Sequence, residues 1–140
     1  MISFEGANPR HEHEWRVFQE VKLPPGKVII PGVLDSVSNA VEHPRVVADR
    51  IVRFANVVGR ENLIAGTDCG FATFAASVIV HPTIAWAKLR SLTEGAKLAS
   101  EELWPRSPGP TDLLSSGYAA GIARGSEPFH RHRPEDCALL

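Results

Sequence analysis

The sequence has little of what marks several protein classes. Its 140 residues include only two cysteines, Cys69 and Cys137, too few for a disulfide framework, so a reducing, cytoplasmic setting is favoured. A net charge of -1 gives no field that would attract nucleic acid or an anionic membrane surface. No apolar run approaches the roughly 18 residues that a membrane-spanning helix needs. With 44% hydrophobic and 22% charged residues, the composition is that of an ordinary globular domain with neither nucleic acid nor membrane as a partner.

Three successive units each combine a short apolar run with a helical pattern. The first has a strand at residues 1–4 and then a helix from the N-cap Asn8 to about Val21. Trp15, Phe18 and Val21 are expected to form its buried stripe. A core strand that begins at the first residue suggests that the chain starts inside a larger fold.

The second unit begins with residues 28–34, which are rich in β-branched side chains and predict a strand buried on both faces and ending at Asp35. Pro31 and Gly32 within it indicate a bulge or a close approach by another backbone. A helix follows from Pro44 and is closed by Gly59. Its predicted buried positions are spaced four, three and four residues apart: Val47, Ile51, Phe54 and Val58.

The third unit has a strand at residues 63–67, ending at Asp68 and Cys69, and the longest helix, from Pro82. The predicted buried face of that helix consists of Ala85, Leu89, Leu92, Ala96, Ala99 and Leu103. His43 and His81 precede the prolines that begin the two long helices, where capping is the expected role. Alternating strands and helices predict an α/β fold with parallel strands, and three such strands leave two open edges.

Residues 105–140 differ in character from the rest. They are rich in Pro, Gly, Ser and Arg and have no sustained apolar period. We therefore expect a domain at residues 1–104 and a disordered tail at 105–140.

Each predicted strand ends in a side chain that can carry chemistry: Glu5, Asp35, and Asp68 with Cys69. The carboxyl ends of parallel strands meet at one edge of a sheet, where α/β proteins hold their active sites. A thiolate and a carboxylate are suitable zinc ligands, so Cys69 and Glu5 are metal-site candidates. The structural alternatives stay open: a buried apolar cysteine, a carboxylate at a helix start for Glu5, and loop-capping carboxylates for Asp35 and Asp68.

His11 and His13 do not add a metal site in this interpretation. Two residues apart on a helix, they point away from each other.

Three motifs in this order resemble the end of the catalytic barrel of the cobalamin-independent methionine synthase family. They are Phe4-Glu5-Gly6-Ala7-Asn8-Pro9-Arg10, then Gly26-Lys27-Val28 leading to Pro31-Gly32-Val33-Leu34-Asp35-Ser36, and Thr67-Asp68-Cys69-Gly70-Phe71. The wider methionine synthase II group, with epoxyalkane:coenzyme M transferase, shares this layout. The resemblance covers about residues 1–104 and implies a partial (β/α)8 TIM barrel, its last three βα units.

Family members hold one catalytic zinc through a His-x-Cys pair, a glutamate and a second cysteine. The resemblance matches Glu5 to the glutamate and Cys69 to the second cysteine; the strand carrying His-x-Cys would precede this sequence, in a missing N-terminal half. It implies transfer of a methyl or alkyl group from a small-molecule donor to a thiol. In methionine biosynthesis this is the 5-methyltetrahydropteroyltriglutamate-homocysteine S-methyltransferase reaction.

One position departs from the methionine synthases. They carry a histidine, thought to donate a proton, two residues after the aspartate that matches Asp35, and here that position is Val37. The departure favours a relative that uses a different thiol or donor. Asp35 itself is expected to orient substrate.

Three hypotheses follow. The chain is a module of a zinc-dependent transferase, an inactive truncated product with the fold's signature, or an interaction module that pairs through its open sheet edges. Because two of four expected ligands are absent, we favour the second for the chain alone and the first for the family it resembles.

Overall fold

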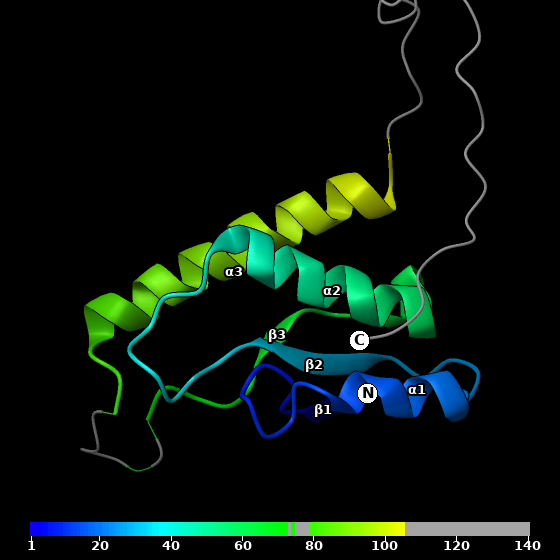
Figure 1. Cartoon of the computed structure of the whole chain (residues 1–140), viewed down its shortest axis with the longest axis horizontal. Helices are drawn as coiled ribbons and strands as arrows, with labels where there is room; N and C mark the ends of the chain where they lie inside the picture. Colours follow the sequence, from blue (N-terminus) through cyan, green and yellow to red (C-terminus); the bar gives the residue numbers. More distant parts are fainter. Residues whose placement is uncertain (73, 75–78, 106–140) are drawn as a thin grey trace, which may run out of the picture. The chain divides into compact units, whose positions relative to one another are not determined.

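The computed structural model describes residues 1–72, 74 and 79–105 (Figure 1). The tail predicted at 105–140 therefore lies outside the described residues, except for Pro105. The strands are β1 (Ile2–Phe4), β2 (Ile29–Leu34) and β3 (Gly66–Thr67). The helices are α1 (Val17–Glu20), α2 (Pro44–Val58) and α3 (Pro82–Leu103), with short 3-10 turns η1 (Glu14–Arg16) and η2 (Arg60–Asn62).

The strands form one three-stranded sheet in the order β1-β2-β3, and both neighbouring pairs are parallel. The α/β prediction with parallel strands is thus confirmed. The third strand is shorter than predicted, because only Gly66–Thr67 forms a ladder and Leu63 contributes an isolated bridge to Ile29. Within the described ranges the sheet stays open and closes no barrel.

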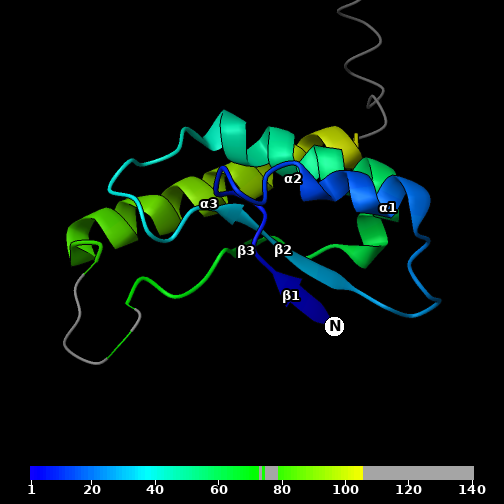
Figure 2. The ribbon, with the colours of Figure 1, turned by 60° about the horizontal axis from the view of Figure 1, so that its bottom comes forward.

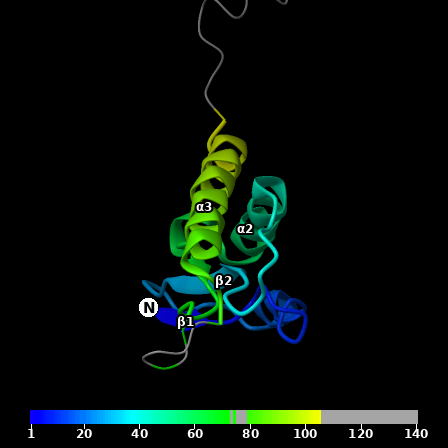
Figure 3. The ribbon, with the colours of Figure 1, turned by 90° about the vertical axis from the view of Figure 1, so that its left-hand side faces the viewer.

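The long helices α2 and α3 pack side by side over one face of the sheet (Figures 1 and 3). The short helix α1 lies beside α2 (Figure 2). The core between helices and sheet is formed by Ile29, Val33, Leu34, Val47, Ala48, Ile51, Phe54 and Ala99. Burial of these apolar side chains is the main stabilising contribution to the fold.

Helix α2 has the predicted ends. His43 precedes Pro44, and its Nδ1 accepts a hydrogen bond from the Arg45 N–H at 3.1 Å. Gly59 follows the last helical residue with a φ of 89°, a conformation that favours glycine. His81 caps α3 in the same way as His43, accepting from the Thr83 N–H at 3.3 Å.

The buried face of α3 differs from the prediction. Its buried residues are Lys88, Ser91, Gly95 and Ala99, whereas the predicted apolar positions other than Ala99 are only half-buried. A Cβ at Gly95 would lie 2.6 Å from the Val47 Cβ, so the glycine lets the two helices approach closely. This contact turns the side of α3 that carries small and polar residues onto α2.

The helix predicted from Asn8 to Val21 was wrong in extent. Residues 7–13 form turns, and only η1 and α1 are helical. Asn8 caps the first turn as predicted, because its Oδ1 accepts the Arg10 N–H at 3.1 Å and its carbonyl accepts the Glu12 N–H at 2.9 Å, but the turn does not continue as one regular helix. Trp15 and Phe18 pack against the core as predicted, but Val21 is 59% exposed.

In the described part of the chain, no helix is long and apolar enough to cross a membrane.

Candidate functional site

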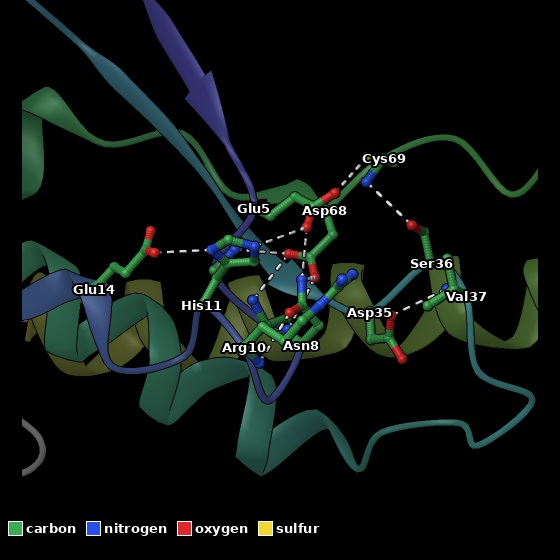
Figure 4. A network of polar contacts seen from close by, with 12 residues as sticks. Glu5, Asn8, Arg10, His11, Glu14, Asp35, Ser36, Val37, Asp68 and Cys69 are labelled. Carbon is green, nitrogen blue, oxygen red and sulfur yellow. Dashed lines mark hydrogen bonds and ion pairs between the residues drawn. The ribbon is translucent and has the colours of Figure 1, made fainter. Parts of the chain in front are cut away.

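Glu5 and Cys69 lie together at the carboxyl ends of β1 and β3. The Cys69 Sγ–H donates a hydrogen bond to the Glu5 Oε1 at 3.0 Å, across 64 positions of sequence. Figure 4 shows both side chains beside Asp68, with the turn after β2 next to them. Cys69 is exposed and free, not the buried apolar cysteine of the structural alternative. We call Glu5, Asn8, Ser36, Asp68 and Cys69 the strand-end rim.

Asp68 fixes the backbone that carries Glu5. Its Oδ1 accepts the N–H groups of Gly6 and Ala7 at 2.8 and 2.9 Å, and its Oδ2 accepts the N–H of Asn8 at 2.9 Å. Asp68 is only 8% exposed, and hydrogen bonds to a buried carboxylate are among the stronger ones in proteins. The residue therefore joins the loops after β1 and β3 and does not merely cap its own turn.

Asn8 links the two carboxylates. Its Nδ2 donates to the Glu5 Oε2 at 2.8 Å and to the Asp68 Oδ2 at 2.9 Å. Both hydrogens of one amide are thus used on neighbouring acids, which holds the Glu5 side chain toward Cys69. The sequence predicted Asn8 as a helix cap and missed this role.

A glycine in β2 makes room for Asp68. A Cβ at Gly32 would lie 1.9 Å from the Asp68 Oδ1 and 2.7 Å from its Cα. The close approach predicted at Pro31 and Gly32 is therefore confirmed, and the register between β2 and β3 shifts between Gly32 and Leu34.

The side chains of Glu5 and Cys69 shift each other's pKa. The hydrogen bond to Glu5 raises the pKa of the Cys69 thiol, and partial burial and the negative charges of Glu5 and Asp68 add to this. The hydrogen bond from Cys69, followed by that from Asn8, lowers the pKa of Glu5. Without a metal the pair is a protonated thiol on an ionised carboxylate, so metal binding must release the thiol proton.

Asp35 lies at the end of β2 but is turned to its own loop. Its Oδ1 accepts the Val37 N–H at 3.0 Å. Burial raises the pKa of Asp35, but hydrogen bonds from Val37 and Ser38 and the charge of Lys88 outweigh it and leave the pKa lowered. The next residue, Ser36, is buried, and its Oγ accepts the Cys69 N–H at 3.1 Å. Sequence reasoning missed Ser36, because its partner is 33 positions away.

The two histidines after β1 are placed differently. The Nε2 of His11 lies 3.5 Å from the Glu5 Oε2, and its Nδ1 lies 2.8 Å from the Glu14 Oε1. His13 is exposed. The structure therefore does not join them as a metal-binding pair.

Glu5 and Cys69 fit part of a zinc site. With usual bond lengths, an oxygen and a sulfur ligand of one tetrahedral zinc lie about 3.6 Å apart. The observed 3.0 Å between Oε1 and Sγ needs only a small side-chain rotation to admit one ion. Among the residues that the structure describes, no group of three or more His, Cys, Asp or Glu side chains could hold a metal. The rim thus offers two donors of suitable chemistry and does not complete a site.

Comparison with protein-family models gives no match, and comparison with curated protein sequences gives none. Among solved structures, the chain is similar to a B12-independent methionine synthase from Shewanella sp. W3-18-1 in complex with selenomethionine, with a TM-score of 0.59 and 22% sequence identity. The match covers 73% of this chain and 27% of that enzyme's chain. The chain therefore shares the fold of part of a methionine synthase.

Proposed function

We propose that this chain supplies Glu5 and Cys69 as two zinc ligands of an enzyme that transfers a methyl or alkyl group to a thiol. The remaining ligands would come from residues outside these 140. The observation that carries the proposal is the 3.0 Å contact between a carboxylate and a free thiol at the carboxyl ends of two parallel strands. The fold shared with part of a methionine synthase supports the same family of reactions.

A bound zinc would hold the acceptor thiol as a thiolate, the form that attacks an electrophilic carbon. The protein's own residues prepare the place for it. Asn8 and Asp68 hold Glu5 toward Cys69, while the exposed Sγ stays open to solvent and to a small molecule. Asp35, ionised at the adjacent strand end, would orient a substrate with a positive group.

Val37 bears on which thiol and which donor the enzyme uses. The residue is 55% exposed, and its apolar side chain cannot transfer a proton. We therefore favour a relative that uses a donor or thiol other than those of methionine synthesis, such as an epoxyalkane:coenzyme M transferase-like enzyme. Homocysteine methylation with a folate donor is the second candidate.

Residues 1–104 would be the last three βα units of a (β/α)8 barrel, and 105–140 a separate tail. An enzyme with a free thiol ligand is suited to the reducing cytoplasm.

Cobalt(II), which reports thiolate ligation by a charge-transfer absorption, tests the two-ligand proposal on the full 140-residue chain. The background is Cys137→Ser, which leaves Cys69 as the one thiol. We expect a charge-transfer band that saturates at one ion per chain. Cys69→Ser should abolish the band, and Glu5→Gln should weaken cobalt binding by about tenfold or more.

The matched control for the charge is Glu20→Gln, an exposed carboxylate on α1, which should leave the titration unchanged. A chain that gives no band, or a band that survives Cys69→Ser, would contradict the proposal.

A further inference from the structure

Glu42 makes polar contacts to three elements although it lies in none of them. Its Oε2 accepts a hydrogen bond from the Lys88 Nζ at 2.7 Å, and its Oε1 accepts the Asp35 N–H at 2.8 Å. Its backbone carbonyl accepts the hydroxyl of Ser91. The Arg50 Nη1 lies 4.0 Å from the same Oε1. One side chain thus joins the end of β2 to α2 and α3.

Lys88 is an unusual partner for this carboxylate. It is fully buried, in the middle of the face that α3 presents to the rest of the fold. Removing an ammonium group from water is costly, and well-packed apolar residues often replace a buried ion pair without loss of stability. Stability alone therefore does not account for a lysine and a glutamate here. The pair instead fixes one carboxylate oxygen at one backbone N–H.

That N–H belongs to the first residue after β2. The ladder to β3 ends when the Leu34 carbonyl accepts the Asp68 N–H at 2.9 Å, so the N–H of Asp35 needs another partner. Glu42 supplies it. The backbone direction after β2 is thereby set by a side chain that α3 holds in place.

The turn after β2 contacts the residue that carries the thiol. Ser36 follows Asp35 directly, is 1% exposed, and accepts the Cys69 N–H on its Oγ. A continuous path of polar contacts runs from Lys88 through Glu42 and the turn after β2 to the backbone of Cys69. Figure 4 shows the last part of this path, from Ser36 to Cys69.

We propose that Glu42 is a positioning residue for the Cys69 thiol: it accepts the Asp35 N–H, fixes the turn that carries Ser36, and so sets where the Sγ lies relative to Glu5. Lys88 keeps the carboxylate oriented. The inference rests on the proposed function only in taking Cys69 as a metal ligand.

Two double variants separate positioning from stability, each made in the full chain with Cys137→Ser. Both remove the buried ion pair. E42Q/K88M keeps a side-chain oxygen for the Asp35 N–H, whereas E42L/K88M keeps none and replaces the pair with apolar groups. Thermal unfolding, cobalt(II) affinity and hydrogen exchange of the Asp35 and Cys69 amides are measured on both.

We expect similar unfolding temperatures for the two variants. The Gln variant should keep cobalt affinity within a few-fold of the parent, and the Leu variant should lose about tenfold or more. The two amides should exchange faster in the Leu variant only. Ser36→Ala breaks the same path at its other end and should lower cobalt affinity by the same amount as the Leu variant. It tests the inference if the Leu variant does not fold.

Equal cobalt affinity and equal amide exchange in the Gln and Leu variants would overturn the inference, as would a Ser36→Ala chain that binds cobalt like the parent. If the parent itself shows no band that depends on Cys69, the proposed function fails. The amide exchange then decides the positioning role by itself.

Discussion

The strand-end rim and the helix layer of α2 and α3 are stabilised in different ways. The helices meet at a close contact between Gly95 and Val47, and apolar side chains of α2 together with Ala99 of α3 pack in the core. The rim depends on polar contacts between residues about 60 positions apart, centred on the Asp68 carboxylate. Changes in the contacts between α2 and α3 at Gly95 and Val47 should therefore alter stability and spare the site, while changes in the rim should remove the site.

The largest effect is expected for Asp68→Asn. The amide oxygen could still accept the N–H groups of Gly6 and Ala7, but the N–H₂ would then face the Asn8 N–H and leave this buried donor without its acceptor. We expect a loss of about 2–3 kcal/mol in the free energy of unfolding, measured with urea, and loss of the cobalt band.

The matched control is Asp49→Asn, whose side chain is 58% exposed and pairs with Arg45 on the surface of α2. It should change the free energy of unfolding by less than about 0.5 kcal/mol. An Asp68→Asn chain that keeps the cobalt affinity of the parent would show that Asp68 does not hold the metal ligands in place.

A smaller effect is expected for Gly95→Ala in the helix layer. The added Cβ would lie 2.6 Å from the Val47 Cβ and 2.8 Å from the Pro44 carbonyl oxygen. Overpacking costs about 1–3 kcal/mol, and alanine regains about 1 kcal/mol of helix propensity. The net loss in the free energy of unfolding should be about 1 kcal/mol, with cobalt affinity unchanged.

Val47→Ala in the Gly95→Ala background should not recover that loss, because it removes the Val47 Cγ1 at 2.7 Å but keeps the Cβ at 2.6 Å, and it empties space at a fully buried position. If Gly95→Ala weakens cobalt binding as much as Asp68→Asn, the two regions are not separable.

The smallest effect concerns pH. Because the hydrogen bond to Glu5 raises the pKa of Cys69, less of the thiol is ionised at a given pH than in an ordinary cysteine. Glu5→Gln removes the negative charge, so the pKa should fall and alkylation of Cys69 should become several-fold faster near pH 8. The rate is followed with iodoacetamide against pH in the Cys137→Ser background.

Glu20→Gln is the control, since Glu20 is an exposed carboxylate on α1. A midpoint of the pH profile that does not move in Glu5→Gln would show that the carboxylate does not govern the thiol.

The same contrast explains what could be predicted from sequence. Helix α2 follows from local rules: proline at its start, apolar residues every three or four positions, and glycine after its end. The first helix was wrong in extent, since only Val17–Glu20 is α-helical after the turn that Asn8 caps. The bonds from Asn8 to Asp68 were missed, because no local pattern reveals a partner 60 positions away. In α3 the apolar repeat was real but did not mark the most buried face, because the close Gly95 contact and the Lys88–Glu42 pair lie beside it.

For the site, sequence order predicted which side chains end the strands, and the parallel sheet brings Glu5 and Cys69 together. Their role as ligands stays a prediction. Ser36 and Glu42 could not be predicted, because each acts through a backbone N–H whose position depends on the tertiary fold.

X-ray absorption at the zinc edge tests most directly whether one ion binds both the Glu5 carboxylate and the Cys69 thiolate. In the Cys137→Ser chain loaded with zinc, we expect one protein sulfur at about 2.3 Å and an oxygen shell at about 2.0–2.2 Å. Cys69→Ser should remove the sulfur from the spectrum, and Glu5→Gln should reduce the oxygen shell or the occupancy. A zinc ion surrounded only by oxygen and nitrogen in the Cys137→Ser chain would contradict the shared site.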